Sequence, residues 1–385
     1  MTRNKSIALI LVLWTAGLGA AAQFAKISLI FPDLQNYYAD AGSALGFMVS
    51  LLSFLGIVLG LFAGMLVARL GFRKLLLFAL LLGAAVSLYQ ASLPPLPLML
   101  GSRVLEGVSH LIIVVAAPTL IAQISPDRLR PFAMTLWGTF FGVAFTIVAW
   151  FGLPMIEIHG IASLFYAHAL WLIGAAIVLY FMLPALNRGK GERPSLALSE
   201  IIRRHVESYR SPFISAPALG WLFYALTFVA LLTILPGYLD PQDRAFVSGA
   251  MPIASIIASM SLGALLLRYT SAINIVLLGF ALSGVMMIVL LLTGATPWSC
   301  ILLFAALGLV QGASFAAIPQ LNNKPQAQAL TNGAMAQMGN LGNMCGTPLL
   351  LFLVSQFSFP GLVFFALTAY IGGFILHMFL QRKRR

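Results

Sequence analysis

The sequence predicts an all-α polytopic membrane protein with twelve transmembrane helices in two pseudo-symmetric bundles of six. Of its 385 residues, 61% are hydrophobic and 8% are charged, and the mean hydropathy is +0.98. Soluble proteins carry about 25% charged residues, so no soluble core of this size can hide so much apolar surface. A spanning helix needs roughly 20 apolar residues, and the chain has room for about a dozen with short connections.

Twelve apolar stretches of suitable length follow one another along the chain. The first comes after Arg3 and Lys5, as in a signal peptide, but it is too long for one and no small-residue cleavage site follows a short core. We therefore interpret it as a helix. The expected spans are 6–31, 44–67, 74–92, 96–124, 132–153, 161–183, 213–239, 246–267, 272–293, 298–321, 329–356 and 361–380.

The longest polar interruption divides these spans into six and six. It predicts an N-terminal six-helix bundle (1–186), a cytoplasmic linker (187–212) and a C-terminal six-helix bundle (213–385). Part of the linker reads as an amphipathic helix lying at the membrane surface, with Ser199 able to cap its start. A plain linker with a helical stretch fits almost as well. The apolar residues of this helix are Leu198, Ile201, Ile202 and Val206.

The basic residues predict the orientation of the chain. With the N-terminus inside, 19 of the 22 Lys and Arg fall in cytoplasmic segments, Lys26 and Arg103 fall inside spans, and only Arg244 lies in an outer loop. We therefore expect both termini in the cytoplasm and place the protein in a bacterial cytoplasmic (inner) membrane. The net charge of +12 resides at helix ends, so nucleic acid is not expected as a partner.

Short matches relate the two halves. Gly64 and Arg69 recur 199 residues later, and the pair Glu106-Gly107 has a counterpart in Gln311-Gly312, 205 residues later. Similar halves imply a cavity at a pseudo-symmetry axis, where rocking of the halves alternates access to the two sides. Four further residues recur at a spacing of 201: Pro118, Ala133, Met134 and Gly138 become Pro319, Ala334, Met335 and Gly339.

Two segments carry a family resemblance. The turn GMLVARLGFRK resembles the loop pattern G-x-L-a-D-R-x-G-R-K of the major facilitator superfamily, and RVLEGVSH resembles that family's R-x-x-Q-G-x-G pattern through Arg103 and Gly107. The resemblance implies the fold of that family, with helices 1, 4, 7 and 10 lining a central path. The loop residues that we assign to a cytoplasmic gate motif are Gly64, Arg69, Gly71 and Arg73.

The chain departs from the family pattern in two places that matter. Ala68 stands at the acidic position of the loop, so the gating charge network there must be weaker or rebuilt with another residue such as Asp127. In the fifth span Val143 stands where the family's antiporter motif has proline, which argues against a drug–proton antiporter.

The fourth span carries three ionisable residues on one helix face, because Arg103, Glu106 and His110 are spaced by three and four. Ionisable groups at membrane depth are costly and usually functional. If the first and fourth helices face one cavity, as the resemblance implies, Lys26 lies within reach of Arg103 and Glu106. Two cations and one anion then favour an anionic or zwitterionic solute.

We assign proton coupling to Glu106, with Arg103 and His110, and substrate binding to Lys26 and Arg103. Burial favours a protonated carboxyl and a neighbouring cation favours its ionised form, so Glu106 can load and release a proton. Three alternatives stay open. Arg103 and Glu106 can form a static ion pair, His110 can be a packing residue, and Lys26 can extend to the outer surface.

The C-terminal half offers neutral polar and aromatic groups instead. We expect them to contribute to substrate binding, with helix–helix contacts or interfacial anchoring as the alternative. Tyr166 and His168 of the sixth span are interpreted as structural or rim residues. The C-terminal candidates are Gln311, Gln337, Asn340, Trp221 and Tyr224.

The leading hypothesis is a secondary active transporter that moves a small polar metabolite, anionic or zwitterionic, by proton-coupled alternating access, with symport favoured. The alternatives are a proton-antiport exporter of drugs or metabolites, a lipid flippase and a transporter-like sensor. We see no nucleotide-binding loop and no catalytic or metal-ligand set, so we expect no enzyme, metal or cofactor. The expected partners are a small-molecule substrate, protons and the lipid bilayer, with the protein a monomer.

Overall fold

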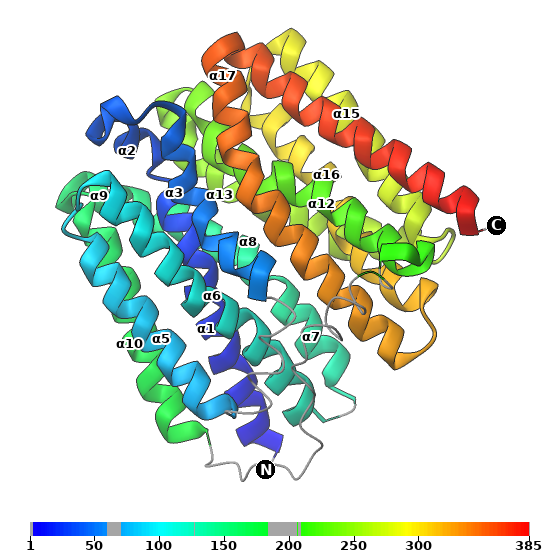
Figure 1. Ribbon diagram of the computed structural model, residues 1–385, viewed down its shortest axis with the longest axis horizontal. Coiled ribbons are helices and arrows are strands. Elements are labelled where there is room, and N and C mark those ends of the chain that lie inside the picture. Colours follow the sequence, from blue (N-terminus) through cyan, green and yellow to red (C-terminus); the bar gives the residue numbers. More distant parts are fainter. Residues whose placement is uncertain (1–2, 60–70, 127, 184–205, 207–208, 385) are drawn as a thin grey trace. The chain divides into compact units, whose positions relative to one another are not determined.

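The computed structural model describes residues 3–59, 71–126, 128–183, 206 and 209–384 (Figure 1). These residues fold into helices and connecting turns, without a strand. They include eleven helices long and apolar enough to cross a membrane. The last, within α17 (Pro325–Arg384), is interrupted at Ser358, where φ is +52°, and so supplies two crossings. The predicted twelve-helix, all-α architecture is confirmed.

The chain forms two compact units. The first takes its described residues from 1–38 and 58–195. In this unit α1, α5, α6 and α10 enclose an aliphatic core that contains Leu13, Leu76, Ile113 and Leu172, all fully buried. The helices of the first unit are α1 (Arg3–Ser28), α2 (Phe31–Tyr37), α5 (Phe72–Gln90), α6 (Leu96–Ile124), α7 (Arg130–Gly138), α8 (Phe140–Ile147), the π-helical turn η3 (Val148–Gly152), α9 (Leu153–His159) and α10 (Ala162–Met182).

The second unit takes its described residues from 39–57 and 196–385. Its N-terminal segment packs on α17, and Gly46 lies so close to Pro348 that a side chain at this glycine would collide with the proline backbone. The helices are η1 (Ala39–Gly46), α3 (Phe47–Ser50), η2 (Leu51–Ser53), α12 (Pro212–Ile234), η4 (Leu235–Tyr238), α13 (Pro241–Ala258), η5 (Ser259–Gly263), α14 (Ala264–Leu266), α15 (Ala272–Thr293), α16 (Pro297–Leu321) and α17.

The two compact units of the structure differ from the two predicted bundles in the placement of the second span. The prediction follows chain order, whereas residues 39–57 group with the C-terminal helices because they pack on α17. The boundaries 1–186, 187–212 and 213–385 therefore stay a prediction. Most of the predicted linker helix lies outside the described residues, including Leu198, Ser199, Ile201 and Ile202. Of the apolar residues assigned to its buried face, only Val206 is described.

The observed ends of several helices can be explained by the residues found there. The fourth span matches its predicted bounds, as α6 covers Leu96–Ile124. The first helix ends at Ser28 instead of residue 31, because Pro32 has no N–H to donate to the Ser28 carbonyl. The fifth span runs on to His159 instead of 153, and Gly160, with φ at +77°, ends it.

Candidate functional site

The three charged residues predicted to lie together do so in the first unit. The Lys26 ammonium, in the last turn of α1, is 2.7 Å from Oε1 of Glu106 on α6. Arg103, one turn earlier on α6, pairs with Oε2 of the same carboxylate. All three side chains are 0% exposed. The predicted proximity is confirmed, and Lys26 is buried rather than extended to the surface.

Two further residues complete the surroundings of Lys26. Its Nζ is 2.9 Å from Oγ of Ser87 on α5 and 3.3 Å from Nδ1 of His168 on α10. Together with Glu106 these give three acceptors for the three protons of the ammonium group. The sequence prediction described His168 only as a structural or rim residue, whereas the structure places it against the charged cluster.

The hydrogen bonds of His168 define its tautomer. Its Nε2 is 2.9 Å from the carbonyl oxygen of Gly19, which can only accept, so Nε2 carries the proton. The Ser87 hydroxyl uses its single proton on the carbonyl of Phe165, at 3.0 Å. Nδ1 lies 2.9 Å from Oγ of Ser87 and 3.3 Å from Nζ of Lys26. An unprotonated Nδ1 can accept from the ammonium, so a neutral His168 fits beside a charged Lys26.

Amide side chains hold the other side of the cluster. Nε2 of Gln90 donates to Oε2 of Glu106 at 2.9 Å and to Oγ of Ser102 at 3.0 Å. Arg103 also donates to the carbonyl of Gln23, at 2.9 Å. With Glu106 ionised and both cations charged, these three groups carry a net charge of +1 in a buried site.

His110 makes contacts that join two helices. Its Nδ1 is 3.0 Å from the carbonyl of Ala20, and its ring packs edge-to-face on Phe24 with centroids 5.2 Å apart. These contacts tie α6 to α1, as the packing alternative expected. A part for His110 in proton transfer stays a prediction.

Sequence reasoning singled out the charges and missed the neutral groups that hold them. Ser87 and Gln90 lie one turn apart on α5. That spacing was the available signal, because residues three apart share a helix face. Serine and glutamine also occur in spans as helix-packing groups, so the spacing carries meaning only once the facing helix is known.

In the second unit the amide candidates bond to neighbouring helices. Gln311 accepts from Ser255 at 3.1 Å. Gln337 accepts from Tyr209 at 2.9 Å and donates to the carbonyl of Ile57 at 3.2 Å. Their arrangement follows the alternative of helix–helix contacts, and a substrate role stays a prediction.

The remaining substrate-binding candidates of this unit also contact protein groups. Asn340 donates to the Ala336 carbonyl of its own helix at 2.8 Å. Trp221 and Tyr224 stack on each other with centroids 4.4 Å apart, and Trp221 also meets Phe315 edge-on. Both rings are thus packed against protein groups in this structure, and their binding to substrate stays a prediction.

Two residues of the predicted gate motif, Gly71 and Arg73, are described, and each has a local structural role. Gly71 precedes α5 with φ at +84°, a conformation that other residues rarely adopt. Arg73 donates to the Tyr180 carbonyl at 3.0 Å and lies over the Tyr180 ring, 4.9 Å from its centroid. Gly64, Arg69, Ala68 and Asp127 lie outside the described residues.

Each unit has a contact between a histidine and a glycine, with the two glycines 201 residues apart and the two histidines 209 apart. In the first, His168 of α10 bonds to the carbonyl of Gly19 on α1. In the second, the ring of His377 on α17 lies directly against Gly220 on α12 and would collide with any side chain there. Gly19 and Gly220 are 201 residues apart, the spacing at which four other residues recur.

A second contact gives the same spacing for the fourth helix of each half. A side chain at Gly83 would meet Ser109 of α6, at 2.6 Å, and one at Gly279 would meet Val310 of α16, at 2.7 Å. Ser109 and Val310 are again 201 apart, whereas Gly83 and Gly279 are 196 apart. At this spacing His110 aligns with Gln311, and the pairing of Glu106 with Gln311 stays a prediction.

The same spacing identifies the counterparts of the charged cluster. Lys26, Arg103 and Glu106 correspond to residues that are also fully buried but carry no charge. The second unit therefore fills these positions with neutral side chains. The counterparts are Thr227, Phe304 and Leu307.

Comparison with known proteins gives two findings. A sequence model described as the Major Facilitator Superfamily matches residues 11–325. The structure resembles the crystal structure of a bacterial homologue of the human lysosomal transporter Spinster, in an inward-facing and unoccupied conformation, with a TM-score of 0.73 and 11% identity over 99% of this chain and 96% of that one. At this identity the likeness shows the fold alone. A search of curated proteins found no match.

Proposed function

The chain belongs to the major facilitator superfamily of membrane transporters, and we propose that it moves a small organic anion or zwitterion by proton-coupled alternating access, in symport. The observation that carries this proposal is the buried cluster of Lys26, Arg103 and Glu106. The same proposal places the protein in the cytoplasmic membrane of a bacterium, with both termini in the cytoplasm.

The charge of the cluster supports an anionic substrate. Two cations share one carboxylate in a site where all three side chains are fully buried. A buried charge without a partner is costly, so the excess positive charge favours binding of a further anion. A cationic substrate would add to the excess, which is why drug export by proton antiport is disfavoured.

The position of Glu106 supports coupling to protons. Its carboxylate competes with any anion for Lys26 and Arg103, and protonation of Glu106 changes the charge of the cluster from +1 to +2. Anion affinity then rises, and by linkage a bound anion raises the proton affinity of Glu106 equally. Proton and anion therefore bind together, which is the requirement for symport.

The internal repeat supports function over bracing. A static Arg103–Glu106 pair explains the same contact within α6, but Phe304 and Leu307 fill the corresponding positions of α16 without charge. Replacing buried ion pairs by apolar groups is often neutral or stabilising. Retention of three charges at this depth is thus better explained by transport.

Transport in proteoliposomes tests the proposal. Purified protein is reconstituted, a proton gradient acid on the outside is imposed, and uptake of labelled carboxylates and amino acids is measured. We expect the gradient to drive accumulation of an anion by the unmodified protein. In Glu106→Gln we expect exchange of the anion to persist and gradient-driven accumulation to be lost.

Glu157 provides the matched control, because its carboxylate is exposed near the end of α9. Glu157→Gln should accumulate the anion as the unmodified protein does. Equal accumulation by Glu106→Gln would exclude Glu106 as the proton carrier. Accumulation of lipophilic cations alone, with the opposite dependence on the gradient, would establish antiport instead.

A further inference from the structure

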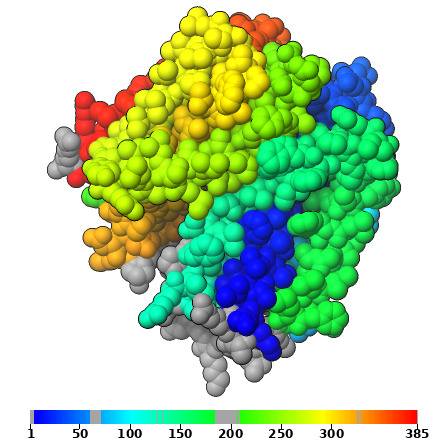
Figure 2. Space-filling model, turned by 180° about the vertical axis from the view of Figure 1, so that it is seen from behind, coloured from blue at the N-terminus to red at the C-terminus, as the bar shows by residue number. Residues whose placement is uncertain are grey.

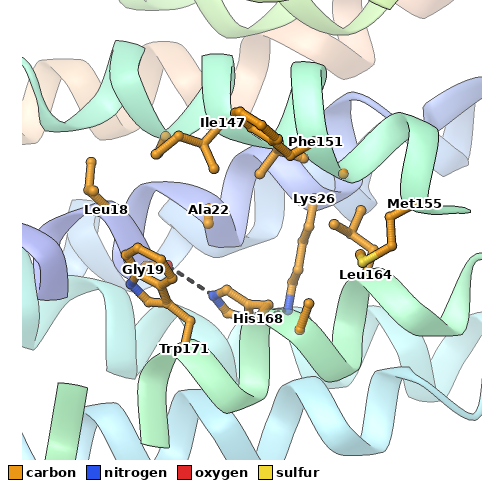
Figure 3. A pocket seen from close by; sticks show the side chains of 14 residues that line it. Leu18, Gly19, Ala22, Lys26, Ile147, Phe151, Met155, Leu164, His168 and Trp171 are labelled. Carbon is orange, nitrogen blue, oxygen red and sulfur yellow. Dashed lines mark hydrogen bonds between the residues drawn. The ribbon is translucent and has the colours of Figure 1, made fainter. Parts of the chain in front are cut away.

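The first unit contains a pocket beside Lys26 that the proposed function does not use. It has a volume of about 180 Å³ and lies between α1, the segment α8–η3–α9, and α10 (Figure 3). Figure 2 shows part of α1, in blue, uncovered between the segments that flank it in this unit. Among the fourteen lining residues only Lys26 and His168 are titratable, and nearly all the others are apolar.

Small residues and a helix irregularity make the space. Gly19 and Ala22 of α1, Ala144 of α8 and Ala167 of α10 present no bulky side chain to it. The opposite wall includes part of η3, a π-helical turn in an otherwise α-helical span. Such π-bulges are rare and frequently mark functional sites.

The size and the lining fit a particular kind of occupant. An engineered apolar cavity of about 150 Å³ binds benzene, so this pocket matches one aromatic ring or a chain of about six carbons. A two-chain lipid is too large for it. Phe151, 71% exposed, and Trp171, 43% exposed, form part of the wall and offer aromatic faces to such a group.

We propose that this pocket receives the apolar body of an aromatic or short-chain monocarboxylate, whose anionic group meets Lys26 beside His168. The inference rests on the proposed function, since it takes the positive cluster as the partner of the anion, and it names the substrate class. Of the three acceptors around the ammonium, His168 is the most distant, at 3.3 Å. A carboxylate oxygen takes its place without separating Lys26 from Glu106.

Binding measurements in lipid nanodiscs test the inference. The probes are benzoate and hexanoate, compared with benzyl alcohol and hexanol, which keep the apolar body without the charge, and with acetate, which keeps the charge alone. Dissociation constants are measured by calorimetry. We expect both carboxylates to bind, the alcohols to bind about tenfold or more weakly, and acetate to bind weakly as well.

Two variants of α10 locate the binding. Ala167 is exposed and lines the pocket, so Ala167→Leu fills part of it and leaves the core intact. Gly174 is also exposed, lies two turns further on the same face and has open space around it, so Gly174→Leu is the matched control. We expect Ala167→Leu to weaken benzoate binding about tenfold or more and Gly174→Leu to leave it unchanged.

The outcomes separate this inference from the proposed function. If anions bind equally to the unmodified protein and to Ala167→Leu, or if the alcohols bind as well as the carboxylates, the pocket is not the site of the substrate body and the inference is wrong. Gradient-driven uptake of polar anions in proteoliposomes would then still support proton-coupled transport. If benzoate binds as expected but the proton gradient does not drive its uptake, only the coupling fails.

Discussion

The ammonium of Lys26 and the carboxylate of Glu106 form a fully buried ion pair that joins α1 to α6. The pair belongs to a set of three charges that add up to +1, held by neutral groups from α5 and α10. Because the corresponding positions of the second unit are uncharged, the energetic cost of this set is particular to one half of the chain. That asymmetry gives the first prediction.

Removing one charge from the cluster should destabilise the protein, and replacing all three should not. Lys26→Thr leaves Glu106 with one cation, and breaking a buried pair in this way costs about 3–5 kcal/mol. The triple variant Lys26→Thr, Arg103→Phe and Glu106→Leu installs the residues of the second unit. We expect it to recover most of the lost stability and to lack anion transport.

Unfolding by denaturant in detergent, with helicity as the signal, measures these differences. Substitutions within one network do not have additive effects on the free energy of unfolding. The triple variant should therefore lose less stability than the summed losses of the three single variants. A triple variant less stable than every single one would show that the charges are needed for packing. The uncharged positions of the second unit would then not support a transport role for the charges of the first.

His168 should be neutral, with its proton on Nε2. The carbonyl of Gly19 fixes that proton, and Nδ1 accepts from Lys26. Nitrogen-15 chemical shifts of labelled histidine measure the tautomer, with His168→Gln used to assign the signal. We expect an unprotonated Nδ1 between mildly acidic and mildly alkaline pH. A doubly protonated ring at neutral pH would contradict the proposed hydrogen bonds.

Gly220 should be intolerant of a side chain because the ring of His377 lies against it. We expect Gly220→Ala to lower the melting temperature, since inserting a methyl group into a packed site costs about 1–3 kcal/mol. Gly237→Ala is the control, because nothing lies within 4 Å of the added atom. The double variant Gly220→Ala with His377→Ala should regain part of the loss, and no gain would argue against this contact.

The architecture was predictable because it depends on local composition. Every span needs a long apolar stretch, and charged residues are easily seen within such stretches, so Lys26, Arg103 and Glu106 could be identified. That Lys26 lies near the other two followed from the family resemblance. The groups around them were less accessible. Ser87, Gln90 and His168 are ordinary polar residues of spans, and their meaning depends on which helix faces face one another, a property of tertiary packing.

The same limit explains the repeat and the pocket. Matches in the sequence paired Glu106 with Gln311, whereas the spacing of Gly19 and Gly220 aligns His110 with Gln311, and packing contacts are needed to choose between the two. The pocket depends on η3, a local change of helical winding that apolar residues such as Val148 and Phe151 do not announce. The hydrophobic pattern predicts a helix in this segment, but it does not distinguish a π-helical turn from an α-helical one.

The orientation of the chain can be tested by labelling from outside the cell. The distribution of Lys and Arg predicts that Asp243, in the first turn of α13, faces outward and that Arg382, at the end of α17, faces the cytoplasm. Single cysteines are placed at these positions in a background lacking Cys300 and Cys345. A membrane-impermeant maleimide should label Asp243→Cys in intact cells and Arg382→Cys only after permeabilisation. The reverse pattern would invert the topology and with it the side from which protons reach Glu106.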